Sequence, residues 1–177
     1  MTIGIDLDDT LIDTKETANK YLKEFIKDES LKDYHNLSKK EYNKFLNKYL
    51  YKIQKESTIK DKAIETIKYL NANGFRIVII TARGSLNYLK SKHITEKYLS
   101  QNNIIYDKII YNQNHKYKAC QKEKVDLFID DKEWVLDEVK DHGIKTLKFL
   151  VDNETSKHDK VKNWQEVKDY IINLWGG

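Results

Sequence analysis

The stretch from residue 3 to residue 11, Ile3-Gly4-Ile5-Asp6-Leu7-Asp8-Asp9-Thr10-Leu11, is the most informative part of this chain. Its apolar start predicts a buried β-strand, and the end of such a strand is where open α/β sheets place ligands. Three carboxylates follow within four positions. Grouped carboxylates are costly unless a cation neutralises them or one of them binds a proton. The stretch therefore predicts a site for a hard metal ion, with one carboxylate free for covalent chemistry.

The composition limits the class of protein. The 177 residues suffice for one domain, or for one domain with a small insertion. The 32 basic and 28 acidic residues leave a net charge of +4 without a uniformly basic block, so there is no strong nucleic-acid signal. Cys120 is the only cysteine, which excludes an intramolecular disulfide, and no apolar run approaches the roughly 18 residues that span a bilayer. We therefore expect a soluble, cytoplasmic protein without a membrane partner, whose oligomeric state the sequence does not specify.

Two helices are predicted between the first strand and the second. Apolar residues recur at helical spacing over residues 18–26 and, more strictly, over residues 42–53. Ser38 and Glu41, just before the second run, form a capping-box signature. A polar linker around residues 28–36 separates the two runs. We therefore predict a helical insertion over residues 15–58, within a core made of residues 1–14 and 59–177.

The rest of the chain alternates between strands and helices. The apolar runs predict strands over residues 75–80, 108–111, 125–129 and 144–151. The helical patterns fall over residues 61–72, 86–100, 116–123, 133–141 and 163–174. Strands that alternate with helices indicate an α/β fold with a three-layer, Rossmann-like and mostly parallel sheet.

Polar residues that suit phosphate chemistry follow three of these strands directly. Asp6, Thr81 and Asp130 each come after an apolar run that ends at the preceding residue. The carboxyl ends of parallel strands lie along one edge of a sheet, so we expect these three residues to meet in one crevice. Three such strand ends with complementary chemistry are unlikely to coincide by chance.

These residues resemble the motifs of the haloacid dehalogenase-like (HAD) superfamily of phosphohydrolases. Motif one matches residues 6–11, motif two matches residues 79–83, and motif four matches residues 126–131 with its paired Asp130-Asp131. The resemblance implies that Asp6 is the nucleophile, which attacks phosphorus to form an aspartyl-phosphate. It also implies that Asp8 protonates the leaving oxygen and then activates water. An acid at position 8 argues against halide chemistry, which in this family proceeds without one.

The resemblance further implies a magnesium ion and a set of phosphate ligands. The ion would be held by Asp6, by the backbone carbonyl of Asp8 and by Asp130, because hard oxygen ligands suit Mg²⁺. Asp131 would support this shell, or cap a helix, and Thr10 would orient the turn by hydrogen bonding. The predicted phosphate-binding residues are Thr81, Arg83 and a lysine of motif three; Arg83 could instead be a surface residue.

The motif-three lysine is either Lys116 or Lys118. Lys116 lies four residues before Cys120, so the two share a helix face, and a small residue such as Cys120 is expected to pack inward. Lys118 would point roughly to the opposite side of the helix. We therefore predict that Lys116 binds the phosphate.

The helical insertion corresponds to the cap that sets specificity in this superfamily. Within it, the chain looks most similar to the deoxy-type 5′-nucleotidase (pyrimidine nucleotidase-like) group, through Ile129-Asp130-Asp131, the Lys116 to Cys120 spacing and the Trp164 to Val167 spacing. This predicts a nucleoside monophosphate as the small phosphorylated substrate. The alternatives are a phosphatase of a small non-nucleotide metabolite, a polynucleotide-end phosphatase, a response-regulator receiver, and a phosphate-binding regulatory module without turnover.

Overall fold

The computed structural model describes residues 1–26, 31–151 and 154–175. The described strands are β1 (Thr2–Ile5), β2 (Arg76–Ile80), β3 (Lys108–Ile110), β4 (Leu127–Asp130), β5 (Lys145–Phe149) and β6 (Asp159–Val161). The helices are α1 (Thr14–Phe25), α2 (Lys39–Glu56), α3 (Ala63–Ala72), α4 (Ser91–Gln101), α5 (Tyr117–Lys122), α6 (Glu133–Asp141), α7 (Trp164–Trp175) and the short 3₁₀ helix η1 (Tyr34–Asn36). None of the described helices is long and apolar enough to cross a membrane.

The strands form one sheet in the order β3-β2-β1-β4-β5-β6, and all the pairings between them are parallel. β1 lies in the middle, where Ile5 is in register with Ile79 of β2 and with Ile129 of β4. After β1, the chain adds β2 and β3 on one side of it and then β4, β5 and β6 on the other side. The carboxyl end of β1 is therefore the point where the strand order reverses, which is where open α/β sheets bind ligands.

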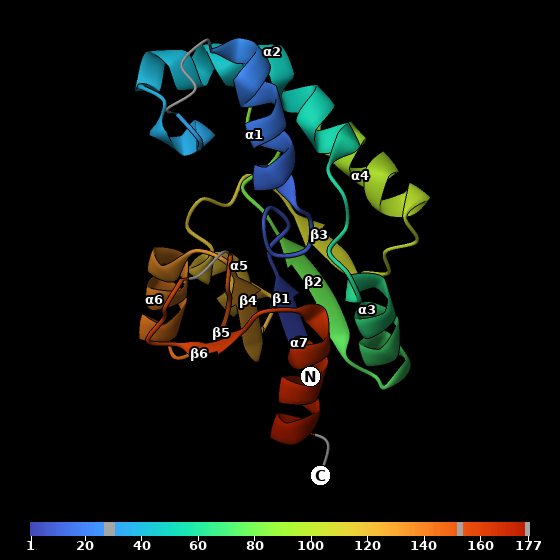
Figure 1. Cartoon of the computed structure of the whole chain (residues 1–177). Helices are drawn as coiled ribbons and strands as arrows, with labels where there is room; N and C mark the ends of the chain where they lie inside the picture. Colours follow the sequence, from blue (N-terminus) through green and yellow to red (C-terminus); the bar gives the residue numbers. More distant parts are fainter. Residues whose placement is uncertain (27–30, 152–153, 176–177) are drawn as a thin grey trace.

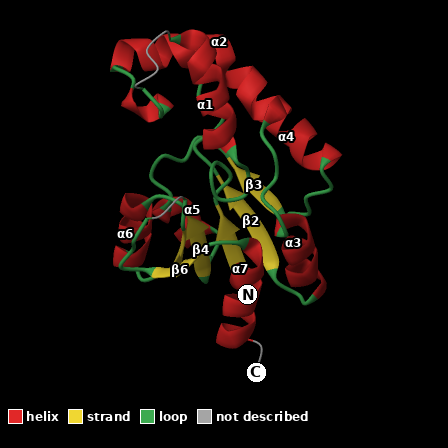
Figure 2. Cartoon of the chain, in the orientation of Figure 1, coloured by secondary structure: helices red, strands yellow, loops and turns green. Residues whose placement is uncertain are grey.

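Alternate residues of the central strands face two separate cores. Ile3 and Ile5 pack in one apolar cluster with residues of α3, α4 and α7. Val78, Ile80 and Phe128 pack in a second cluster with residues of α5 and α6. The helices accordingly cover both faces of the sheet (Figures 1 and 2), which confirms the three-layer fold expected from the sequence.

Close packing against β4 explains why a glycine, Gly4, lies inside β1. A Cβ atom on Gly4 would lie 2.7 Å from the Phe128 ring and 3.0 Å from Val125. The neighbouring strand therefore fills the space where a side chain would stand, and the close approach holds β1 against β4.

Helices α1 and α2 pack against each other around a third apolar cluster that includes Phe45 and Tyr49. The predicted capping box is present, because the Ser38 hydroxyl and the Glu41 carboxylate bond each other's backbone N–H groups. Figure 1 shows α1 and α2 beyond the carboxyl ends of the strands, with α4 alongside α2. Part of the predicted polar linker, residues 28–30, lies outside the described residues.

The two segments that connect these helices to the sheet, around residues 11–13 and 58–60, lie side by side. The Asp13 N–H donates to the Thr58 carbonyl at 2.9 Å, and the Lys60 N–H donates to the Leu11 carbonyl at 3.0 Å. The insertion thus leaves the sheet and returns to it at one place. That place directly follows the carboxylates of motif one.

Two details differ from the sequence prediction. The helix expected from residue 86 begins at Ser91, and Leu86 and Leu89 before it are exposed. The strand β6 was not predicted, because its Asp159-Lys160-Val161 sequence contains only one apolar residue. A short edge strand pairs on one side only, so it needs little apolar patterning.

Candidate active site

The structure brings the predicted residues of three strand ends to one edge of the sheet. Asp6 follows β1, Thr81 follows β2, and Asp130 is the last residue of β4. The Asp6 N–H donates to the Ile129 carbonyl at 3.0 Å, which continues the pairing of β1 with β4 by one residue. All three side chains are buried, with exposures of 4% or less.

Lys116 connects two of these carboxylates. Its Nζ atom lies 2.5 Å from Asp6 Oδ1 and 2.7 Å from Asp130 Oδ2, although the three residues are distant in sequence. Burial alone would lower the pKa of Lys116, but the charges of Asp130 and Asp6 outweigh it and raise the pKa. Lys118 is exposed and lies over the Tyr117 ring. Lys116 is therefore the lysine of the predicted pair that the fold places among the carboxylates.

The loop after β1 returns Asp8 to the same edge. The Leu11 and Ile12 N–H groups both donate to the Leu7 carbonyl at 2.9 Å, and Asp9 has a positive φ of 62°. The buried indole of Trp164 at the start of α7 donates to the Thr10 carbonyl at 3.0 Å. The turn is therefore held by its own backbone and by the C-terminal helix. The Thr10 hydroxyl makes a 3.5 Å contact with Asp131, which links motif one to motif four.

Arg83, a candidate phosphate clamp or surface residue, is buried and bonds Asp8. Its Nε and Nη2 atoms reach the Asp8 carboxylate at distances of 2.6 to 3.1 Å, and its Nη1 atom donates to the Thr95 hydroxyl at 3.2 Å. The Thr14 hydroxyl, at the start of α1, donates to Asp8 at 2.6 Å. Arg83 therefore binds an aspartate of motif one in this structure, and the alternative of a surface residue is wrong.

Asp8 is held in its ionised form by these contacts. Burial tends to raise its pKa, but the charge and the hydrogen bonds of Arg83, with the hydrogen bond of Thr14, lower the pKa from 3.8 to about 2. The Thr81 hydroxyl accepts a hydrogen bond from the Arg83 N–H at 3.1 Å. Arg83 thus holds both the Asp8 carboxylate of motif one and the Thr81 hydroxyl of motif two in place.

We expect Arg83→Met to weaken the link between Asp8 ionisation and stability. In the wild type the folded-state pKa of Asp8 is depressed, so its contribution is present above pH 4 and is lost as the pH falls from about 4 to about 2. Without the guanidinium, burial dominates and the pKa rises. The variant should be less stable by about 2 kcal/mol at pH 7, with a smaller further loss in acid. Urea unfolding at pH 7 and pH 3 measures both effects.

Arg76→Met is the matched control, because Arg76 is the other arginine of the chain and pairs with Glu123 instead. Lys108 also bonds Glu123 and keeps its pKa lowered, so Arg76→Met should keep most of the wild-type dependence of stability on pH in this acidic range. If the two variants lose stability in acid to the same degree, Arg83 does not control the ionisation of Asp8.

Three carboxylates at the sheet edge could hold a cation. Asp6, Asp130 and Asp131 each offer an oxygen, and these oxygens lie within 4.8 Å of one another. Burial, followed by the charges of Asp130 and Asp6, raises the pKa of Asp131. Burial also raises the pKa of Asp6, although the charge of Lys116 opposes it. Carboxylates that resist ionisation in this way are stabilised when a divalent cation binds between them.

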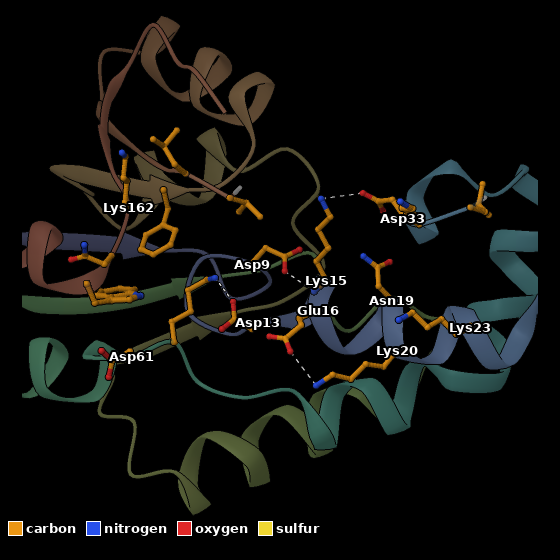
Figure 3. Close-up of a pocket in the computed structure, with 18 of the residues that line it drawn as sticks. Asp9, Asp13, Lys15, Glu16, Asn19, Lys20, Lys23, Asp33, Asp61 and Lys162 are labelled. Atoms are coloured by element: carbon orange, nitrogen blue, oxygen red, sulfur yellow. Dashed lines mark hydrogen bonds and ion pairs between the residues drawn. The ribbon is translucent and has the colours of Figure 1, made fainter. Parts of the chain in front are cut away.

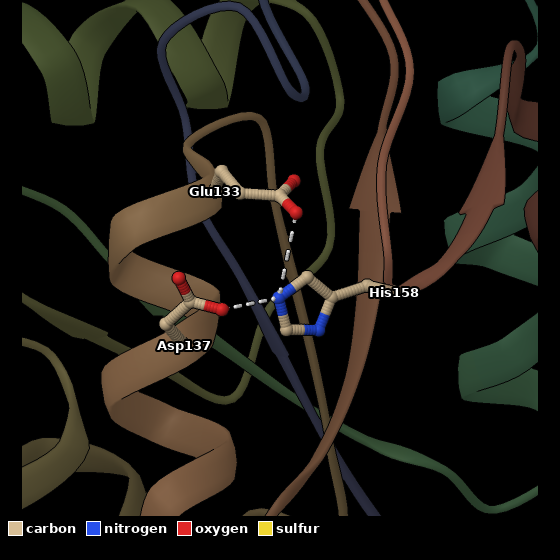
Figure 4. Close-up of side chains that lie close together, drawn as sticks. All are labelled: Glu133, Asp137 and His158. Carbon is tan, nitrogen blue, oxygen red and sulfur yellow. Dashed lines mark hydrogen bonds and ion pairs between the residues drawn. The ribbon is translucent and has the colours of Figure 1, made fainter.

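A second group of residues that could bind a metal, Glu133, Asp137 and His158, already has hydrogen-bond and ion-pair partners within the protein. His158 Nε2 lies 2.9 Å from Asp137 and 3.9 Å from Glu133 (Figure 4). Lys157 pairs with Asp137 at 2.8 Å, and the Ser156 hydroxyl donates to Glu133 at 2.7 Å. This cluster joins the segment before β6 to α6, so its role in the fold is structural.

A cleft of about 1480 Å³ lies beside the motif-one loop. It is bordered by α1, by the end of β5 and by the start of α7. Figure 3 shows that Asp9 and Lys15 line one part of it and that Lys162 lies across from them. Within the described chain, Asp9 joins the cleft to the motif-one loop, whereas Asp6, Lys116 and Asp130 do not line it. Acidic and basic residues both line the cleft.

Sequence reasoning did not assign site roles to several residues that contact the carboxylates. Thr14 and Thr95 orient the pair formed by Asp8 and Arg83. Lys148 is buried and donates to the Asp131 carbonyl, and the Lys132 N–H donates to Asp130 Oδ1 at 2.8 Å. A lysine between the apolar residues Leu147 and Phe149 was the available signal for Lys148.

Known proteins share this arrangement of strands and helices. The chain is 29% identical over 191 aligned positions to a nucleotidase of Clostridium acetobutylicum, covering 99% of this chain and 95% of the relative. Among solved structures, a predicted phosphatase of Clostridium acetobutylicum superposes with a TM-score of 0.69 at 16% identity, covering 98% of each chain. A haloacid dehalogenase-like family hydrolase of Streptococcus pneumoniae gives a TM-score of 0.67 at 16% identity, covering 96% of this chain and 97% of the other.

No protein-family profile matches the chain. The solved structures nonetheless cover 96% to 98% of it. The resemblance that the three motifs indicate is confirmed, and the chain has the haloacid dehalogenase-like fold.

Proposed function

We propose that the chain is a Mg²⁺-dependent phosphomonoesterase that works through an aspartyl-phosphate on Asp6 and acts on nucleoside monophosphates. The observation that carries this proposal is the buried contact of Lys116 with both Asp6 and Asp130. A buried lysine between two carboxylates, at the point where the strand order reverses, provides positive charge where a phosphate would meet a carboxylate. Asp8 lies two residues from the proposed nucleophile, on a loop that turns back to the same edge.

The charges of the site fit one divalent cation. Its ionisable carboxylates outnumber its cations by two, counting Asp6, Asp8, Asp9, Asp130 and Asp131 against Arg83, Lys116 and Lys132. Oxygen-rich donor sets of this kind suit Mg²⁺. We propose that Asp6, Asp130 and the backbone carbonyl of Asp8 hold the ion, with Asp131 in support. When bound, the ion would neutralise charge on the phosphoryl oxygens and on the attacking carboxylate.

The proposed reaction has two steps, which this chain's residues share. An Asp6 carboxylate oxygen bonds to phosphorus, the bond from phosphorus to the ester oxygen breaks, and Asp8 gives that oxygen a proton. In the second step Asp8 takes a proton from water, which attacks phosphorus and releases Asp6 and inorganic phosphate. The ionised Asp8 of this structure matches the second step. A phosphate dianion beside it would raise its pKa and favour the protonated form that the first step needs.

Lys116 and Thr81 are the proposed phosphate ligands. Lys116 has three donors and uses two of them on Asp6 and Asp130, which leaves one for a phosphoryl oxygen. The Thr81 oxygen accepts a bond from the Arg83 N–H, which leaves its own O–H free to donate. Arg83 would act on the substrate through Asp8 and Thr81, and as a direct phosphate ligand only if it left Asp8.

The choice of a nucleotide rests on the nucleotidase relative and on the insertion over residues 15–58. We propose that this insertion acts as a cap over a core of residues 1–14 and 59–177. A cap that joins the core next to Asp8 can cover the leaving group while the phosphate lies at the sheet edge.

The test of this proposal is phosphate release from a panel of nucleoside monophosphates and sugar phosphates with Mg²⁺. We expect turnover of nucleoside monophosphates, its loss in EDTA, and its return when Mg²⁺ is restored in excess. Preference for sugar phosphates would contradict the nucleotidase assignment and leave the chemistry standing. Equal turnover in EDTA and in Mg²⁺ would contradict the metal dependence.

A further inference from the structure

Helix α4 buries polar side chains as well as apolar ones. Ser91, Thr95 and Tyr98 are spaced four and three residues apart on this helix, so their side chains lie on the same side of it. All three are buried, and Thr95 is fully enclosed. These three residues, the polar face of α4, each make a hydrogen bond to another part of the chain.

The two outer residues of the polar face hold α4 against α2. Nε2 of Gln54, a buried residue of α2, donates to the Ser91 hydroxyl at 2.8 Å. The Tyr98 hydroxyl donates to the carbonyl of Ser57, the residue that follows the last turn of α2. Figure 1 shows α4 alongside α2. Because a slide of one helix along the other would leave these buried groups unpaired, the two bonds fix the position of α4 along α2.

Gln54 places an unpaired polar atom in the interior. Its Oε1 atom is buried and has no hydrogen-bond partner among the described residues. A buried unpaired acceptor costs free energy, and an apolar side chain of the same length would avoid that cost. The free energy of folding therefore does not explain this glutamine. The glutamine adds a directional contact with Ser91 of α4.

The central residue of the polar face, Thr95, contacts the pair formed by Arg83 and Asp8. Its hydroxyl accepts a hydrogen bond from Arg83 Nη1 at 3.2 Å, while Nε and Nη2 of the same guanidinium bond the Asp8 carboxylate. A guanidinium is planar and rigid, so fixing one of its nitrogens sets the direction in which the other two donate. Thr95 lies one turn from Ser91, and the position of α4 along α2 therefore also sets the position of Arg83.

We propose that the polar face of α4 is a positioning element for Asp8. Its outer residues fix the helix against α2, and Thr95 directs the Arg83 guanidinium, which holds the Asp8 carboxylate in place. Proton transfer needs the acid at hydrogen-bond distance from the leaving oxygen, so a displaced Asp8 would protonate that oxygen poorly. The inference rests on the proposed function, because it concerns the acid of the same reaction.

Two variants break this series of contacts at different points. Thr95→Val removes the hydroxyl and keeps the shape of the side chain. The joint variant, Gln54→Met with Ser91→Ala, removes both partners of one bond between α2 and α4. Because neither partner is then left unpaired, and the unpaired Oε1 atom is removed as well, the joint variant should fold as the wild type does.

The first experiment compares esters that differ in their need for an acid. Uridine 5′-monophosphate and glucose 6-phosphate release an alkoxide that must gain a proton, whereas p-nitrophenyl phosphate releases a stable anion. For the better of the two alkyl esters, we expect kcat/KM to fall about tenfold in Thr95→Val and about three- to fivefold in the joint variant. For p-nitrophenyl phosphate it should change by less than about twofold. Combining the variants should cost less than the product of the two losses, because both act through Arg83.

Thr95→Ser and Ser100→Ala complete this comparison. Thr95→Ser restores the hydroxyl that Arg83 bonds and should recover most of the activity that Thr95→Val loses. Ser100→Ala is the matched control, because it makes the same change as Ser91→Ala at an exposed position of the same helix, and it should behave as the wild type does. An equal loss on p-nitrophenyl phosphate would overturn the proposal, since that loss does not arise from the acid. Wild-type kinetics of the joint variant on both alkyl esters would overturn it too.

A measurement without turnover separates this proposal from the proposed function. The chain has only two arginines, so their Nε–H groups give two signals in a proton–nitrogen NMR spectrum, which Arg83→Met assigns. The Arg83 Nε–H donates to Asp8 from a buried side chain, whereas the Arg76 side chain is 38% exposed. We expect the Arg83 Nε–H to exchange with water about threefold faster or more in Thr95→Val and in the joint variant, with the Arg76 signal unchanged.

The exchange rates decide the proposal even if the wild type has no turnover. Faster exchange confined to Arg83 would then support the positioning of Asp8 by α4, and only the proposed chemistry would fail. Unchanged exchange at Arg83 in the joint variant would overturn the positioning element, whatever the turnover. Equal acceleration at both arginines would also overturn it, because it would indicate a general loosening of the fold.

Discussion

Asp6→Asn is expected to remove phosphatase turnover, with a fall in kcat of about 10⁴-fold or more, while the protein stays folded. The amide that replaces the carboxylate is a poor nucleophile for phosphorus, so the proposed aspartyl-phosphate cannot form. The fold should persist because Lys116 keeps its contact with Asp130. Burial raises the pKa of Asp6, so its ionised form costs free energy, and the variant should be at least as stable as the wild type at pH 7. Steady-state phosphate release and thermal unfolding measure the two effects.

Asp9→Asn is the matched control for this experiment. It makes the same chemical change three residues away, at a carboxylate that accepts the Lys15 N–H at 2.7 Å. Asparagine keeps that acceptor and tolerates the positive φ of this position. We expect activity within a few-fold of the wild type. Turnover by Asp6→Asn at the level of Asp9→Asn would exclude Asp6 as the nucleophile.

Lys116→Met is expected to have the largest effect on stability, a loss of about 3 to 5 kcal/mol at pH 7 in EDTA. The substitution keeps an apolar stem of similar length and leaves two buried carboxylates without their shared cation. It should also reduce kcat by several orders of magnitude, because the proposed phosphate site loses its buried positive charge. Urea unfolding and phosphate release measure the two losses.

The stability loss of Lys116→Met should depend on pH in a defined direction. The folded-state pKa of Asp6 is already raised from 3.8 to about 7 in the wild type, and removing the lysine raises it further. A carboxyl with a raised pKa makes the folded state less stable as the pH rises from about 4 through 7. Up to about pH 7 folded Asp6 holds its proton in both proteins, so its share of the difference from the wild type should be small below pH 7 and should grow as the pH rises above 7. Lys118→Met should show neither effect, and a pH-independent loss at position 116 would argue for lost packing instead.

Much of the fold could be predicted from sequence because the strands around β1 are buried on both faces. Such strands are nearly continuous apolar runs, so β2 was recognisable from its composition and its end was marked by Thr81. Helix α2 was recognisable from its helical spacing and from Ser38 and Glu41 at its start. β6 was not, because a short edge strand is specified by its neighbour and carries little pattern of its own.

The sequence alone determined the chemistry that gathers at the sheet edge. Asp6, Thr81 and Asp130 each follow an apolar strand, and parallel strands must end at a common edge, so their proximity follows from pattern and topology. The same reasoning favoured Lys116 over Lys118 from helix periodicity. These inferences depend only on regularities of the backbone, which short stretches of sequence specify.

Only the tertiary structure decided which charged groups pair with one another. Arg83 was predicted as a phosphate ligand or a surface residue, yet its guanidinium binds Asp8, 75 positions away. Such pairings depend on side-chain directions and on the angle at which α1 leaves the sheet, which no local pattern records. Sequence patterns specify where strands and helices end, whereas long-range packing determines which side chains meet there.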